Sequence, residues 1–263
     1  MSLAVVGSLA LDRVEGGPPR IGGCPFYAAR ALRVLGARAV VVAKCAAADR
    51  RLLLPPLVRL GLPVTWQNST TTAAFSIAYD GNRRRMTVDA VADPWTPEQV
   101  RLPGTRWVHV APLARTDFPP ETLAALARGR RLSLDGQGLV RPGRTGPLEL
   151  DADYDPALLR SVSILKLAEE EAELLVEGLD ERALRRLGVP EIVVTLGSRG
   201  CIVFADGIAE LVRSRQVSSA DPTGAGDAFA AAYLAARSRG NPPTAAARRA
   251  AALVADLLAG RAA

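Results

Sequence analysis

Short apolar runs alternate with segments of helical periodicity along most of the chain. Apolar runs of about four to eight residues between turn residues are typical of buried strands, whereas apolar residues three and four apart indicate helices. The predicted strands are residues 3–7, 39–43, 107–110, 131–134, 163–165, 191–196 and 201–204. The predicted helices are residues 26–35, 52–60, 123–128, 169–176, 225–237 and 244–258. This alternation favours an α/β fold, a doubly wound, mostly parallel sheet flanked by helices.

One segment breaks this rhythm. Residues 72–80 and 83–90 read as two strands, and Asp80-Gly81-Asn82 between them is a turn of the hairpin type. We expect a small β lid at about residues 66–90 that covers an active site or contacts a second subunit, with a simple edge hairpin as the alternative. Without an internal repeat or a linker, residues 1–263 are expected to form one domain that carries this lid.

The composition restricts the class of protein. With 49% hydrophobic and 23% charged residues, the 263-residue chain is typical of a globular protein. Its apolar stretches are shorter than the roughly 18 residues that cross a bilayer, and its start lacks the features of a secretory signal, so no membrane association is expected. Three cysteines far apart and a single histidine fit neither a disulfide framework nor a metal site, and they favour a cytoplasmic protein.

The formal net charge of +6 raises the question of nucleic-acid binding. Such binding needs clustered cations and aromatic residues on which bases can stack, but the arginines of this chain are scattered and no aromatic platform accompanies them. We therefore expect no nucleic-acid partner. A positive field would favour a small anionic substrate such as a nucleotide.

The run Asp221-Pro-Thr-Gly-Ala-Gly-Asp227 carries the clearest chemistry. A strong helix former follows it, so Gly224, Ala225 and Gly226 lie at a helix N-terminus, where free N–H groups and the helix dipole bind an anion. A carboxylate at Asp227 would repel a phosphate there unless its task is to take a proton from a substrate hydroxyl. The alternative is that Asp227 only caps the helix or complements its dipole.

The same run, continued by Ala228-Phe229, resembles the C-terminal signature of the ribokinase-like family, also called the PfkB carbohydrate kinases. The resemblance extends to residues 5–12, Gly22-Gly23, Leu35-Gly36, Asp49 and residues 194–200. It implies a ribokinase-like fold and ATP-dependent phosphoryl transfer to a hydroxyl of a sugar, a cyclitol such as myo-inositol, or a nucleoside. Its implied cofactors are ATP and Mg²⁺, with a monovalent cation near the Asp221 turn as a further candidate.

The resemblance also implies roles for individual residues. Asp227 would be the catalytic base, and the anion hole would be Gly224, Ala225 and Gly226. The residues expected to bind the substrate are Asp12, Gly22, Gly23, Tyr27, Gln137 and Arg141. Asp12 is expected at the end of the first strand, at the carboxyl edge of the sheet, where open α/β folds bind ligands. Those expected to bind the nucleotide are Lys166, Thr195, Gly197, Gly200, Thr223 and Gly224. Asp12 as a turn residue, and residues 195–200 as an ordinary tight turn, are the structural alternatives.

The chain departs from the family pattern at two positions. The family's Asn-x-x-Glu, which the resemblance ties to magnesium and phosphate positioning, aligns with Ala168 to Glu171. The Asn is lost, while Glu171 remains to act on Mg²⁺ through water or to form part of a solvated acidic face. The family's Asn after the double glycine aligns with Tyr27, which argues against a typical ribose as acceptor. These losses leave a second hypothesis open, a ligand-binding or regulatory protein with impaired kinase chemistry. A vitamin-type kinase is a third, weakened by Gly22-Gly23 and the hairpin.

Three further features bear on ligands and partners. Asp135-Gly136-Gln137-Gly138 with Arg141 is similar to a run in family members that act on inositols or related polyols, although a glycine-rich connection with a surface arginine is the alternative. His109, within a predicted strand, is expected to be a satisfied, partly buried residue. Alternating apolar residues on the hairpin would allow a homodimer through the lid; they are Phe75, Ile77 and Tyr79.

Overall fold

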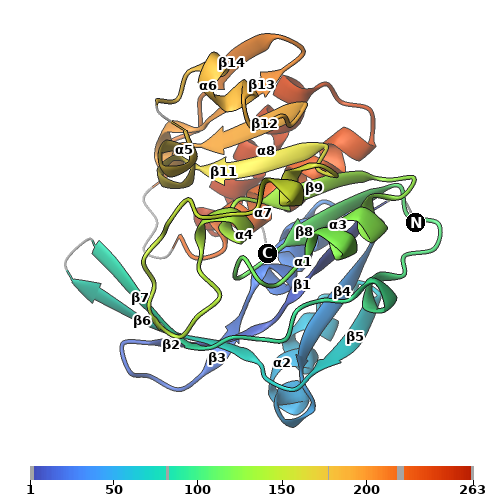
Figure 1. The fold of residues 1–263 in the computed structure, drawn as a ribbon, viewed down its shortest axis with the longest axis vertical. Coiled ribbons are helices and arrows are strands. Elements are labelled where there is room, and N and C mark those ends of the chain that lie inside the picture. The colour runs from blue at the N-terminus through green and yellow to red at the C-terminus, as the bar shows by residue number, and fades with distance from the viewer. Residues whose placement is uncertain (1–2, 81–82, 177, 218–221, 262–263) are drawn as a thin grey trace.

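The computed structural model describes residues 3–80, 83–176, 178–217 and 222–261. Within them the strands form two sheets, one of nine strands and one of five (Figure 1). The large sheet has the order β14-β13-β12-β11-β9-β8-β1-β4-β5. The bounds of its strands are β1 (Leu3–Ser8), β4 (Ala39–Ala46), β5 (Val64–Ser69), β8 (Trp107–Ala111), β9 (Arg131–Asp135), β11 (Ile164–Ala168), β12 (Glu191–Thr195), β13 (Cys201–Ala205) and β14 (Ile208–Val212).

The large sheet is parallel from β5 to β12, and β13 and β14 add antiparallel strands at one edge. Helices cover both of its faces, which is why its central strands read as continuous apolar runs. The helices are α1 (Cys24–Val34), α2 (Arg50–Val58), α3 (Pro120–Ala127), α4 (Gln137–Val140), α5 (Glu169–Leu175), α6 (Glu181–Arg185), α7 (Ala225–Ser238) and α8 (Pro243–Leu258). The prediction of a doubly wound, mostly parallel sheet flanked by helices is confirmed.

Neighbouring residues of β1 show how the core is divided. Val5 packs in a cluster with α1, α7 and α8, whereas Val6 packs on the other face with residues of α3, α5 and α6. Helix α7 is buried along most of its length, and its alanines let it lie close against α1 and the sheet. The first turns of α1 and α7 therefore come together at the carboxyl end of the parallel strands, where open α/β sheets bind ligands.

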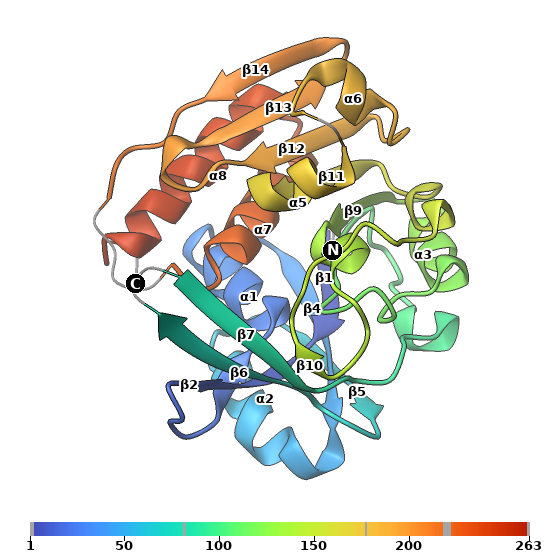
Figure 2. The ribbon, with the colours of Figure 1, turned by 60° about the vertical axis from the view of Figure 1, so that its left-hand side comes forward.

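The small sheet has the order β10-β7-β6-β2-β3. Its strands are β2 (Ala10–Val14), β3 (Arg20–Gly22), β6 (Ala73–Asp80), β7 (Arg83–Ala90) and β10 (Gly146–Pro147). The two predicted strands are confirmed as the antiparallel pair β6–β7, and this hairpin projects away from the large sheet beside β2 (Figures 1 and 2). Gly81 and Asn82 of the predicted turn lie outside the described residues. It is not alone, however, because β2, β3 and β10 extend it into a sheet with an apolar cluster of its own.

The position of Asp12 corrects one prediction. We expected it at the carboxyl edge of the parallel sheet, at the end of the first strand, but β1 ends at Ser8 and the chain then crosses into the small sheet, where Asp12 lies on β2 beside Phe75 of β6. The amide of Leu9 still bonds to the carbonyl oxygen of Lys44 in the large sheet, at 2.8 Å. Residues 9–11 are apolar like residues 3–6, so the sequence did not show that the two runs belong to different sheets.

The hairpin's apolar residues do not all face outwards. Phe75 and Ile77 are buried within the subunit, and Tyr79 is 43% exposed. Dimerisation through the lid, and the assignment of a single domain, stay predictions. None of the described helices combines the length and the apolar character needed to cross a membrane.

Candidate active site

A cavity of about 310 Å³ lies between the small sheet and the first turns of α1 and α7. We call it the hairpin cavity. It is lined by residues from all the predicted substrate-binding segments: Ala10, Asp12, Gly23, Cys24, Tyr27, Phe75, Tyr79, Met86, Leu113, Gln137, Arg141, Pro222, Thr223, Gly224, Gly226 and Asp227. The fold thus brings the predicted base Asp227 to the same space as Asp12, Gln137 and Arg141, which are 215, 90 and 86 residues away from it along the chain.

A second cavity, of about 260 Å³, lies on the other side of the turn before α7. We call it the α8 cavity. Thr195, Gly197 and Gly200, all predicted to bind a nucleotide, line it together with Ser198, Ser214, Arg215, Val217, Pro222, Ala225, Gly226, Phe229, Ala251, Val254, Ala255 and Leu258. Pro222 and Gly226 line both cavities. The turn at residues 222–226 therefore separates the two cavities and borders both of them.

Gly224 has two reasons to be glycine. Its φ of +77° lies in the left-handed region, and a Cβ there would lie 2.2 Å from the ring of Tyr27. Tyr27 thus packs directly on the turn. The amide of Ala225 donates to the carbonyl oxygen of Pro222 at 3.0 Å and so closes the turn, which leaves the amides of Gly224 and Gly226 as candidates for binding an anion. Asp221 lies outside the described residues.

The double glycine serves packing first. A Cβ on Gly22 would lie 2.1 Å from Oδ2 of Asp12, so the glycine lets this carboxylate, only 6% exposed, lie flat against β3. Gly23 has a φ of +89°, and a Cβ there would lie 2.4 Å from the carbonyl oxygen of Ser8. Gly23 lines the hairpin cavity, whereas Gly22 acts on the cavity through Asp12.

A buried charge cluster lies beside the turn. Nζ of Lys166 on β11 is 3.3 Å from Oδ2 of Asp135 on the neighbouring strand β9, and the two side chains are 7% and 1% exposed. Burial lowers the pKa of Lys166, but the carboxylates of Asp135, Glu171 and Asp227 outweigh burial and raise that pKa above its ordinary value. The ammonium therefore stays charged. Asp135 was absent from the predicted site residues, although its place at the end of a strand marked it as a candidate.

Burial also raises the pKa of Asp227, to about 6, and the negative charge of Asp135 adds to this effect. The positive charges of Lys166 and Arg141 and a hydrogen bond from the Cys24 thiol oppose it. Burial raises the pKa of Cys24 well above the ordinary value, so its sulfur keeps its proton and can donate. At pH 7.5 Asp227 is mostly ionised, yet it binds a proton more strongly than an exposed aspartate does. These are the properties that a general base needs.

Glu171 is less accessible than a metal ligand usually is. It is 4% exposed, and its Oε2 accepts a hydrogen bond of 2.7 Å from the amide of Ala168 at the start of α5. Among the described residues, no group of three or more His, Cys, Asp or Glu side chains is placed to hold a metal. Because Mg²⁺ in proteins usually keeps several waters and binds through one or two carboxylates and substrate phosphates, the buried Glu171 could act on it only through water.

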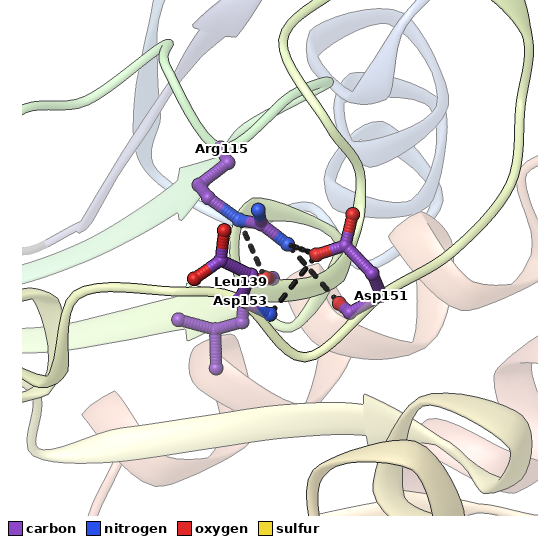
Figure 3. A network of polar contacts seen from close by, with 4 residues as sticks. All are labelled: Arg115, Leu139, Asp151 and Asp153. Carbon is purple, nitrogen blue, oxygen red and sulfur yellow. Dashed lines mark hydrogen bonds and ion pairs between the residues drawn. The ribbon is translucent and has the colours of Figure 1, made fainter.

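A polar network holds α4, the short helix that begins with Gln137 and precedes Arg141. Nε of Arg115 donates to the carbonyl oxygen of Leu139 at 2.9 Å, and its guanidinium also contacts the carboxylate of Asp151 (Figure 3). The amide of Arg115 donates to the carbonyl oxygen of Arg141 at 2.8 Å. These contacts fix the backbone at Leu139, between the cavity-lining residues Gln137 and Arg141, and at Arg141 itself. Sequence reasoning missed Arg115, because the contact joins segments with no shared motif.

His109 differs from its prediction. It is fully buried, its Nδ1 lies 3.2 Å from Oγ of Ser133, and its Nε2 has no hydrogen-bond partner among the described residues. Burial lowers the pKa of His109 to about 4, so the ring is neutral at physiological pH. It lines neither the hairpin cavity nor the α8 cavity.

Comparison with known proteins places this geometry in a family. The model of the pfkB family of carbohydrate kinases matches residues 11–259. The chain is 31% identical over 170 residues to inositol 3-kinase of Zea mays, a match that covers 62% of this chain and 42% of that protein. It is 26% identical over 251 residues to probable fructokinase-3 of Arabidopsis thaliana, which covers 87% and 72%. The chain thus spans about two fifths of the length of the inositol 3-kinase that it matches.

Solved structures agree with this placement. A pyrophosphate-dependent kinase in the ribokinase family, complexed with a pyrophosphate analog and myo-inositol, has 27% identity and a TM-score of 0.85 over 97% of this chain and 94% of that chain. A nucleoside kinase of Burkholderia thailandensis, in complex with inosine, has the same fold, with 20% identity and a TM-score of 0.76 over 98% and 93%. The family match over most of the sequence and the likeness over nearly the whole structure lead to one conclusion: the chain belongs to the pfkB family of carbohydrate kinases.

Proposed function

We propose that this protein transfers the terminal phosphoryl group of ATP to a hydroxyl of a small neutral polyol. The observation that carries the proposal is the meeting of two cavities at the N-terminus of α7, with Asp227 facing one of them and Gly226 lining both. The acceptor lies in the hairpin cavity and the donor in the α8 cavity. The transferring group then passes the turn formed by residues 222–226, where backbone amides and the helix dipole favour negative charge.

In this mechanism Asp227 takes the proton of the acceptor hydroxyl. The hydroxyl oxygen forms a bond to the terminal phosphorus, the bond from that phosphorus to the bridging oxygen breaks, and ADP leaves with the electron pair. The amides of Gly224 and Gly226 stabilise charge on the transferring group. When bound, Mg²⁺ neutralises the donor phosphates, and Glu171 acts on it only through water. General-base help contributes about 10²- to 10⁴-fold in rate.

The lining of the α8 cavity supports a nucleotide as donor. Phe229, Ala251, Val254, Ala255 and Leu258 give it an apolar wall, which suits the flat ring of a nucleobase. Pyrophosphate, the donor named for the neighbour at TM-score 0.85, is the second candidate. A donor made only of phosphates would need several cations to bind it. Arg215, the arginine that lines the α8 cavity, is already paired with Asp256 at 2.7 Å, which favours the nucleotide.

The hairpin cavity supports a cyclic polyol as acceptor. Asp12, Gln137 and Arg141 form a polar wall that can bind hydroxyl groups, whereas Phe75 and Met86 of the hairpin offer an apolar wall. A carbocyclic ring presents hydroxyls at its edge and C–H groups on its face, so it matches both walls. A cyclitol such as myo-inositol is our leading candidate, since inositol kinases are among the relatives.

The test is an acceptor-dependent assay of product release. Purified protein is incubated with Mg²⁺ and ATP, or with Mg²⁺ and pyrophosphate, and with myo-inositol, ribose, fructose or a nucleoside, with and without K⁺. We expect ADP release that requires a cyclitol and that falls at least a hundredfold in Asp227→Asn. If thermal shifts show ligand binding but no acceptor yields product with either donor, the ligand-binding hypothesis replaces this one.

A further inference from the structure

The pair Asp135–Lys166 lies beside the turn that separates the two proposed binding cavities. The two residues are direct neighbours on adjacent parallel strands, so their side chains leave the same face of the sheet. A Cβ built on Gly226 would lie 3.2 Å from Nζ of Lys166, which places the ammonium against the turn that lines both cavities. Oδ1 of Asp135 accepts a hydrogen bond of 3.2 Å from the amide of Gln137, which fixes the carboxylate from the other side.

Stability does not explain such a pair. Buried ion pairs often contribute little to stability or cost some, because both charges lose their hydration. Here the cost falls on the carboxylates near Lys166, because burial raises the pKa of both Asp227 and Glu171. The described surroundings of Lys166 therefore hold more negative than positive charge. An arrangement that costs folding energy beside a candidate active site is typical of a functional role.

We propose that Asp135 is a positioning residue for phosphoryl transfer: it anchors the Lys166 ammonium between Asp227 and the turn at Gly226, where the ammonium serves the base before transfer and the phosphoryl group during it. The proposal rests on the proposed function. It also accounts for the loss at Ala168, because a cation fixed at the turn replaces a neutral amide as the partner of the phosphate.

The two members of the pair act on Asp227 in opposite directions. The charge of Asp135 raises the pKa of Asp227, and the charge of Lys166 lowers it. The other groups that face Asp227 are Cys24 on α1, which donates a hydrogen bond, and Arg141 after α4, and both lower that pKa. Asp12 on β2 lines the same cavity. Removing one member of the pair therefore changes the pH dependence in a direction that identifies it.

The decisive experiment compares Asp135→Asn with Lys166→Met in kcat at saturating substrate between pH 5 and 9. We expect Lys166→Met to lower kcat about a hundredfold. It should also move the acidic limb of the pH profile of kcat, where Asp227 becomes protonated, to higher pH. Asp135→Asn should lower kcat about tenfold, because the ammonium loses its anchor, and should move the limb to lower pH. The double variant, which removes both charges, should restore the thermal stability that either single variant loses. Unshifted limbs, or limbs that move the same way, would overturn the proposal.

A second readout does not need turnover. Asp227→Asn is introduced into the wild type and into each single variant, and the change in the free energy of unfolding is measured at pH 8. The gain in stability should be larger beside Lys166→Met and smaller beside Asp135→Asn, since each background changes the cost of the Asp227 charge. Equal gains in all three backgrounds would show that the pair does not influence the charge of Asp227, and this result would hold even if the wild type proved inactive. An inactive wild type with unequal gains would instead count against the proposed function alone.

Discussion

Replacing Asp227 by Asn should abolish activity and also stabilise the fold. An amide has nearly the shape of the carboxylate, but it cannot accept the acceptor's proton, so kcat should fall at least a hundredfold. The stability gain follows from the raised pKa. An aspartate with a pKa of about 6 in the folded protein and an ordinary value near 3.8 when unfolded pays for its charge on folding.

The size of the gain follows from these two values. One pKa unit corresponds to about 1.4 kcal/mol, so a difference of about two units sets an upper limit of roughly 3 kcal/mol. The Asp227 side chain is partly accessible from the cavity, which reduces the figure to about 1 to 3 kcal/mol. The folded wild type binds its proton more tightly than the unfolded chain does. Its stability therefore falls as the pH rises from about 4 to about 6, whereas the variant is spared this loss.

The assay is urea unfolding of both proteins between pH 4 and 8, with turnover measured in parallel. The gap in unfolding free energy should be full above pH 7, about half its size at pH 5, and small near pH 4. Asp153→Asn, at an exposed position, is the matched control and should change stability by less than about 0.5 kcal/mol. A variant that is less stable than the wild type at pH 8, or a gap that does not depend on pH, would refute the reasoning.

Three other substitutions test single contacts of the site. Cys24→Ala removes the hydrogen bond to Asp227 and should move the acidic limb of kcat to higher pH, whereas Cys24→Ser keeps a donor and should leave it in place. Gly224→Ala should lower the free energy of unfolding in urea by more than about 2 kcal/mol, because it adds a clash with Tyr27 to backbone strain. Gly188, with a φ of +72°, has open space around it, so Gly188→Ala measures the backbone strain alone. Equal losses of stability in the two variants would contradict the packing argument. Arg115→Met should raise the acceptor KM severalfold with the donor KM unchanged, since it frees α4 but leaves the α8 cavity intact, and parallel changes in both constants would argue against this role.

Local sequence signals explain what could be predicted. The start of α7 could be predicted because a glycine-rich turn is followed by a run of alanines, and both signals lie within a few residues of each other. The strand β2 could not be predicted, since the change of sheet after Leu9 depends on pairing with β6, more than 60 residues away. The contact of Asp135 with Lys166 requires the order of strands in the sheet, which no single segment encodes. Helix α4, with four residues, is too short to show a period.

The short strand β10 links the hairpin to the segment that follows Arg141. Strand β10 pairs with β7, and the amide of Leu148 donates to the carbonyl oxygen of Met86 at 2.9 Å. Only a few residues separate this pairing from Arg141. The hairpin is thus tethered at its outer strand to the same segment that carries the polar wall of its cavity. Under the proposed function, a hairpin that lifts to release product would pull on the segment that carries Arg141, so we expect the cover and the acceptor-binding wall to loosen together.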